Sequence, residues 1–210
     1  MNVATLNRTE EAHLVATRKL PDDLSLTEYG DLVDMIRALH RGASWAINPL
    51  MFDAVVAPRL PEARLVRAQY GSDWVLILSI SGGITGILLS LAKVVREMTE
   101  SANLQLSMGG FHTAEVRERN ANAEKTEAET ELLRVQIEER RRALETHDLD
   151  RELRAALSKA LADHGFEAAA ARLEPFKGPG AVASNGISRA LIHAIRDLSI
   201  YDIQLSIEEE

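Results

Sequence analysis

The sequence WVLILSISGGITGILLSLA, from Trp74 to Ala92, contains no charged residue. Extended to Val95, the apolar run covers about 22 residues interrupted only by Lys93, and as a helix it would be roughly 33 Å long. The hydrocarbon core of a bilayer is about 30 Å thick, and a helix satisfies its own backbone hydrogen bonds in lipid. The run therefore predicts a membrane-spanning helix, with Trp74, Lys93 and Arg96 at the membrane interface.

Small residues recur along this run at intervals of four. Gly82, Gly86 and Ser90 form one series, and Ser79 and Gly83 form a second series beside it. On a helix this spacing makes a narrow ridge on which another helix can pack closely. These five residues are therefore predicted to pack against a helix, and the expected partner is a second copy of the chain.

Two other interpretations of the run remain open. In the first, it is a helix buried in the central bundle of an oligomer, because a helix that is apolar all round is buried in either setting. In the second, Val75 to Ile80 form a strand, and Ser81, Gly83 and Gly86 take the glycine positions of G-x-G-x-x-G. This pattern resembles the nucleotide-binding turn of Rossmann folds, although Ser81 replaces the first glycine. The resemblance implies an enzyme that holds a pyrophosphate on backbone amides.

The composition limits the expected partners. The chain has 210 residues, with 24 basic and 32 acidic side chains and a net charge of −8, so nucleic acid is not expected to bind. It has no cysteine, which excludes disulfides and thiolate metal sites. The first 20 residues do not resemble a cleavable signal, and the parts outside the membrane are expected in the cytoplasm.

Residues 1–72 are predicted to form a small α+β head. Residues 13–20 and 65–70 are expected to be strands. The S-x-x-E spacing from Ser25 to Glu28 predicts a capping box, which opens an amphipathic helix that ends at Gly42. The head would be joined directly to the apolar helix.

The predicted apolar helix covers residues 73–98. It is followed by a predicted linker at residues 99–112 and by a predicted charged helical stalk at residues 113–147. Every seventh residue from Val116 to Leu144 gives a weak coiled-coil pattern, because the second core position is mostly polar. Acidic neighbours neutralise Arg140 to Arg142, which favours a solvated face.

Residues 148–210 are predicted to form a helical module that ends in a strand. Leucines recur every four residues in the first helix, and Gly165 ends it in a left-handed conformation. Residues 203–207 alternate between apolar and polar side chains, which is typical of a strand with one buried face. Its neighbour would be the strand at 65–70 or a strand from another copy.

The sequence shows no catalytic motif. The six histidines stand alone, with no H-E-x-x-H pair, and no G-x-S-x-G is present, so no catalytic, metal-binding or cofactor-binding residue is predicted. The predicted fold class is mainly α, with a small α+β N-terminal module and one transmembrane helix followed by a charged helical stalk.

The predicted function is that of a non-enzymatic, self-associating, single-span membrane protein. Its plan is similar to that of small bacterial membrane proteins that act as scaffolds, receptors or membrane effectors. The expected partners are a homo-oligomer, the lipid bilayer and a further protein. The alternatives are a soluble homo-oligomeric interaction protein and a nucleotide-binding enzyme.

Overall fold

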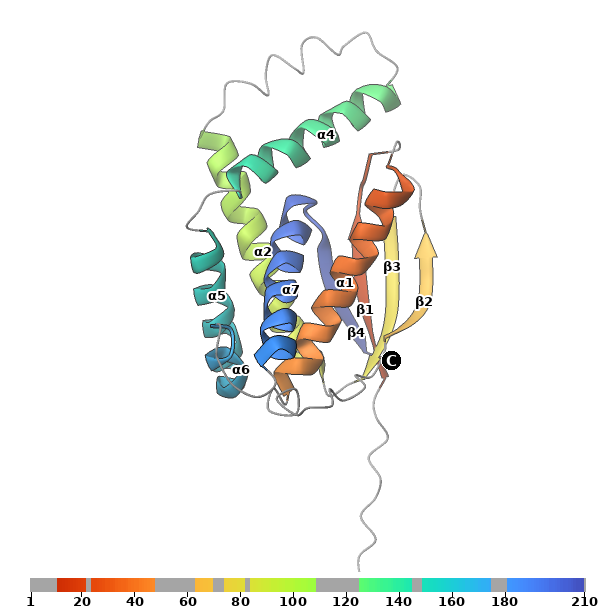
Figure 1. Ribbon diagram of the computed structural model, residues 1–210. Coiled ribbons are helices and arrows are strands. Elements are labelled where there is room, and N and C mark those ends of the chain that lie inside the picture. Colours follow the sequence, from red (N-terminus) through yellow and green to blue (C-terminus); the bar gives the residue numbers. More distant parts are fainter. Residues whose placement is uncertain are drawn as a thin grey trace, which may run out of the picture.

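A computed structural model describes residues 11–21, 24–47, 63–69, 74–81, 84–108, 125–144, 149–174 and 181–209. They form an antiparallel sheet with a layer of helices on one face (Figure 1). Within these ranges, no helix combines the length and the apolar character that crossing a membrane requires. This finding overturns the transmembrane fold class and the single-pass membrane localisation predicted from the sequence.

The sheet draws its strands from both ends of the chain. Its order is β2-β3-β1-β4, and each neighbouring pair is antiparallel. The strands are β1 (Glu11–Arg18), β2 (Arg64–Gln69), β3 (Trp74–Ser81) and β4 (Gln204–Glu209). This is the split βαβ arrangement, in which a third strand separates two parallel ones. The sheet therefore does not belong to the N-terminal part alone.

The apolar run is divided between a strand and a helix, so the prediction of one continuous helix is wrong. β3 takes its first half, and α2 (Thr85–Met108) begins in its second half. Because β3 is an inner strand, Val75 and Ile77 are half-buried even on the face turned away from the helices. An inner strand that is apolar on both faces loses the alternation by which a strand is recognised in a sequence.

α2 is amphipathic rather than uniformly apolar. Its outer face exposes Leu89, Lys93, Arg96 and Glu97. Its inner face is buried in the same core as the sheet, through Ile87, Leu88, Leu91, Val94, Val95, Met98 and Ala102. One apolar stripe is the pattern of a helix that packs on a protein core.

Helix α1 (Leu26–Ile47) packs closely against α7 (Ala181–Ile200) in front of the sheet (Figure 1). The predicted capping box is confirmed, because the backbone N–H of Glu28 donates to Ser25 Oγ at 3.2 Å and that of Ser25 donates to Glu28 Oε2 at 2.8 Å. The helix does not end at Gly42. A Cβ added at Gly42 would lie 2.6 Å from Leu191 Cδ1, so this glycine permits the close approach of α7.

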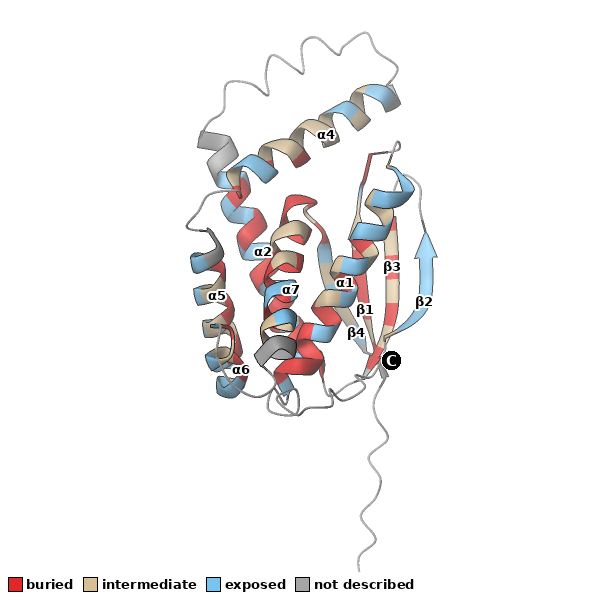
Figure 2. Ribbon diagram, in the orientation of Figure 1, coloured by how far each residue is buried: buried red, intermediate tan, exposed pale blue. Residues whose placement is uncertain are grey.

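The predicted stalk lies against the body of the protein. α4 (Lys125–Ala143) crosses the end of the helix layer, and Ile137, Arg140 and Leu144 are buried (Figures 1 and 2). The expected solvated stalk is therefore wrong for this part of the chain. The i, i+3 and i, i+4 ion pairs on its surface occupy only the outer face of a packed helix.

Two further helices, α5 (Leu149–Asp163) and α6 (Glu167–Ala171), complete the layer. Leu153, Leu157 and Leu161 of α5 are fully buried, and Gly165 has a φ of 82°, so the predicted helix and its left-handed end are confirmed. The predicted C-terminal strand is also present as β4. Its neighbour is β1 rather than the strand near residues 65–70.

Candidate interaction site along α2 and β4

A groove of about 500 Å³ lies between α2 and β4, the edge strand next to β1. Sites that hold small molecules or inserted side chains have volumes of about 300 to 1,000 Å³. The lining combines apolar and charged side chains: Leu89, Ala92, Lys93, Arg96, Thr99, Glu100 and Asn103 from α2, and Asp202, Ile203, Gln204 and Leu205 from the chain that enters β4. The groove can therefore receive a partner that has both apolar and charged groups.

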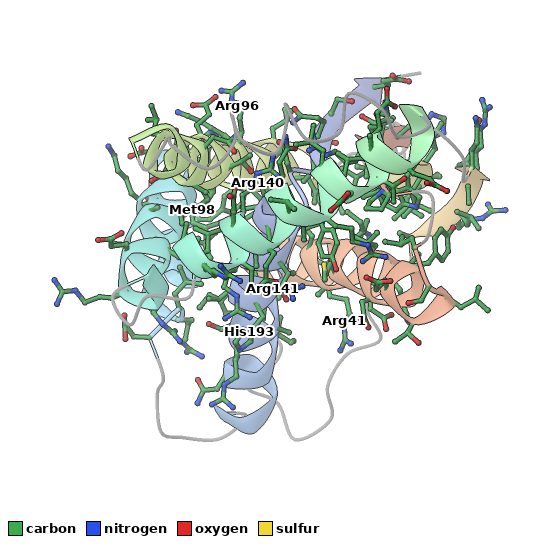
Figure 3. The ribbon with its side chains drawn as sticks, turned by 90° about the horizontal axis from the view of Figure 1, so that it is seen from above. Arg41, Arg96, Met98, Arg140, Arg141 and His193 are labelled. Atoms are coloured by element: carbon green, nitrogen blue, oxygen red, sulfur yellow. The ribbon has the colours of Figure 1, made fainter. Side chains whose placement is uncertain are left out.

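The α2 wall carries two exposed ion pairs. Lys93 Nζ lies 3.8 Å from Glu97 Oε1, and Arg96 Nε lies 3.8 Å from Glu100 Oε1. Figure 3 shows Arg96 on the outer side of α2. Because exposed pairs of this kind contribute only about 0.3 to 0.5 kcal/mol, these side chains can exchange partners at little cost.

The opposite wall is fixed by a buried arginine. Arg140, from α4, donates from Nε to Asn103 Oδ1 at 2.9 Å and from Nη1 to the backbone oxygen of Ile200 at 3.3 Å. Its Nη2 lies 3.4 Å from Asp202 Oδ2, which also lies 2.5 Å from Arg18 Nη1. The cluster therefore connects α4, α2, β1 and the turn between α7 and β4, near the middle of the molecule in Figure 3.

Burial lowers the pKa of the Arg140 guanidinium, and the negative charge of Asp202 opposes this shift. A guanidinium remains protonated in proteins, so its charge must be balanced and its N–H groups must find acceptors. Asp202 has a φ of 54°, and its Oδ1 also accepts a hydrogen bond from Gln204 Nε2 at 3.0 Å. We interpret this cluster as the anchor that holds the turn, and with it the β4 wall of the groove.

The prediction of a solvated face for Arg140 to Arg142 is therefore wrong for Arg140. Arg141 and Arg142 do lie at the surface, where both pair with Glu138 at 3.4 Å. Three consecutive residues of a helix point in different directions, and only the first of these points inward. The sequence contained no signal for this difference, because the residues that receive Arg140 are about 40 to 60 positions away.

The five predicted helix-packing residues do not share one helix. Ser79 lies on β3, and Gly82 and Gly83 lie outside the described residues. Gly86 and Ser90 lie on α2, where Gly86 is exposed and Ser90 is buried with its Oγ donating to the Gly86 oxygen at 2.9 Å. Their part in packing between two copies stays a prediction, and Gly86 is the one that lies on the exposed face of α2.

The three residues predicted at a membrane interface lie in two different settings. Trp74 is fully buried at the start of β3, and its indole Nε1 has no hydrogen-bond partner among the residues that the structure describes. Lys93 and Arg96 line the groove on α2. The exposed ammonium group of Lys93 and the exposed guanidinium group of Arg96 form part of the candidate site, together with Glu97 and Glu100. The two glutamates were not predicted from the sequence. Their i, i+4 spacing from Lys93 and Arg96 was the available signal.

The structure contains the strand that the nucleotide-binding interpretation requires, since β3 spans Trp74–Ser81 and a helix follows it. However, β3 is antiparallel to both of its neighbours, whereas the strands that support the Rossmann turn are parallel. The turn itself includes Gly82 and Gly83, which lie outside the described residues.

Comparisons of the chain with protein families, with curated proteins and with solved structures found no match. Function is therefore inferred from the geometry of the groove and of the helix beside it.

Proposed function

We propose that the protein is a non-enzymatic, self-associating interaction protein and that the outer face of α2 is its contact surface. One observation carries this proposal. The α2 face exposes two leucines, Leu89 at 51% and Leu104 at 64%, on either side of a central group of two basic and two acidic residues. Single exposed leucines are common on protein surfaces, but this face combines two leucines with side chains of both charges, which a partner of complementary charge can meet.

The charged side chains of the groove favour a contact surface. The groove carboxylates each face an arginine, because Glu100 lies 3.8 Å from Arg96 and Asp202 lies 2.5 Å from Arg18. These pairs give the groove side chains of both signs, which can meet complementary charges on a partner. The side chains of the groove can therefore contribute charge and shape to an interface.

Sedimentation of the purified full-length chain over a range of concentrations tests the proposal. We expect a species with twice the mass of the chain, which dissociates on dilution. A single species with the mass of one chain at every concentration would contradict self-association.

A further inference from the structure

We propose that two copies of the chain pair through α2 in antiparallel orientation, about a two-fold axis that passes between Arg96 and Glu97. This inference rests on the proposed function, because it specifies the partner and the geometry of the self-association. It follows from the positions of the exposed α2 residues and from the order of their charges.

The exposed residues lie along one side of the helix. At 100° per residue, most of the exposed positions form a stripe about 100° wide along α2: Gly86, Leu89, Lys93, Arg96, Glu97, Glu100 and Leu104. Exposed Ser101 and Asn103 lie on its two sides. The buried residues of α2 occupy the opposite side and belong to the core. A second helix can therefore lie along the stripe without displacing the core.

The stripe is self-complementary when it meets its own copy in antiparallel orientation. Residues equally far along the helix from the midpoint between Arg96 and Glu97 then lie level with one another. Leu89 faces the partner's Leu104, and Lys93, in the middle of the stripe, faces the partner's Glu100. Arg96 and Glu97 lie about 100° apart on the two margins of the stripe and do not face one another across the pair. The two-fold axis produces each facing contact twice, giving two leucine pairs and two ion pairs of opposite charge.

The charge order distinguishes this arrangement from others. The basic residues Lys93 and Arg96 precede the acidic residues Glu97 and Glu100 along the helix. In a parallel pair, Lys93 and Glu100, in the middle of the stripe, would each meet their own copy and be repelled, whereas in an antiparallel pair Lys93 meets the partner's Glu100. The stripe carries no net charge, so it can self-associate although the chain as a whole carries −8.

The groove beside the stripe gives the partner helix room. Leu89, Lys93 and Arg96 line the groove from the α2 side, with Leu205 on the β4 side. The groove volume of about 500 Å³ can receive side chains that project from the partner helix. At the end of the stripe, an added Cβ at Gly86 would have no atom within 4 Å, which leaves that end open to a second helix.

Charge reversal tests the predicted pairs. Lys93→Glu opposes an acid to the partner's Glu100 at two symmetric places, so we expect dimer affinity to fall at least tenfold, and Glu100→Lys should have a similar effect. The double variant with both changes restores opposite charges and should recover most of the affinity. Lys159→Glu, at an exposed position on α5, is the matched control and should leave affinity unchanged.

Cross-linking tests the orientation independently. The chain has no cysteine, so Leu89→Cys and Leu104→Cys each introduce a single thiol. With a short bis-maleimide, a mixture of the two variants should cross-link. Neither variant alone should do so, because its two thiols would be roughly 20 Å apart along the antiparallel helices.

The outcomes separate this inference from the proposed function. A monomeric wild-type chain would overturn both. A wild-type dimer that is unaffected by either single reversal would overturn the α2 pairing and leave self-association standing. Loss of affinity in both single variants without recovery in the double variant, or cross-linking by Leu89→Cys alone, would overturn the antiparallel register.

Discussion

Replacing Gly42 by alanine should destabilise the protein, although alanine is the better helix former. Gly42 lies within α1, where the added Cβ would be 2.6 Å from Leu191 Cδ1 and 2.9 Å from Leu191 Cδ2. Favourable contact between carbon atoms lies at about 3.5 to 4.0 Å. Leu191 is fully buried, so either its side chain must shift within the packed core or α1 and α7 must move apart.

Two opposing effects set the size of the change. Alanine favours a helix over glycine by about 1 kcal/mol, whereas overpacking a core costs about 1 to 3 kcal/mol. At a separation of 2.6 Å we place the cost of overpacking at about 3 kcal/mol. Gly42→Ala should therefore lower the free energy of unfolding by about 2 kcal/mol.

Gly30→Ala is the matched control on the same helix. Gly30 is exposed, and an added Cβ there would have no atom within 4 Å, so only the helix preference remains. We expect this variant to gain about 0.5 to 1 kcal/mol. Both variants should be compared by urea denaturation at one protein concentration, because association also contributes to apparent stability. If Gly42→Ala proved as stable as Gly30→Ala, the close packing of α1 on α7 would be refuted.

Three further changes address other contacts. Arg140→Met should lower the free energy of unfolding by about 3 kcal/mol, because it removes a buried partner of Asp202. The exposed control Arg142→Met should change it by less than about 1 kcal/mol. Equal effects of the two substitutions in denaturation curves would contradict the buried anchor. The hydrogen bond from Arg134 lowers the pKa of Glu28 from about 4.5 to about 2, so the stabilisation by Glu28 is complete above pH 4.5 and disappears as the pH falls towards 2. Glu28→Gln should therefore be destabilising at pH 7 but nearly neutral at pH 2. An equal effect at both pH values would argue against the ion pair. Burial lowers the pKa of His40, so the unfolded chain takes up a proton at higher pH than the folded chain does. The free energy of unfolding should therefore fall as the pH drops below 6.5, by up to about 1.4 kcal/mol per pH unit. His40→Gln should reduce this loss between pH 7.5 and 5.5, and an unchanged pH dependence would count against the burial of His40.

Local signals predicted several elements correctly. The S-x-x-E spacing at Ser25 and Glu28 became a capping box, and Gly165 ended α5 with a positive φ. The alternating residues near the C-terminus formed β4. Each of these features depends on residues a few positions apart, so the sequence contains all the information that it requires.

The candidate site was predicted only in part. Lys93, Arg96 and Gly86 were singled out for a membrane helix, and they lie on the exposed face of α2. The wall opposite them, with Asp202 and its arginines, comes from segments more than 40 residues away in the sequence. No local pattern identifies such a neighbour, because its position depends on how the whole chain packs.

By itself the sequence determined where the chain is apolar, where its helices are capped and where charges alternate, because these properties belong to neighbouring residues. Only the tertiary structure decided that residues 74–81 are an inner strand and that the helix after them has an exposed charged face. An uncharged run is compatible with either a lipid bilayer or a protein core, since both exclude water. The strands β1 and β2 pair with the two edges of β3, and the helix layer covers one of its faces, where Trp74, Leu76, Leu78 and Ile80 are buried.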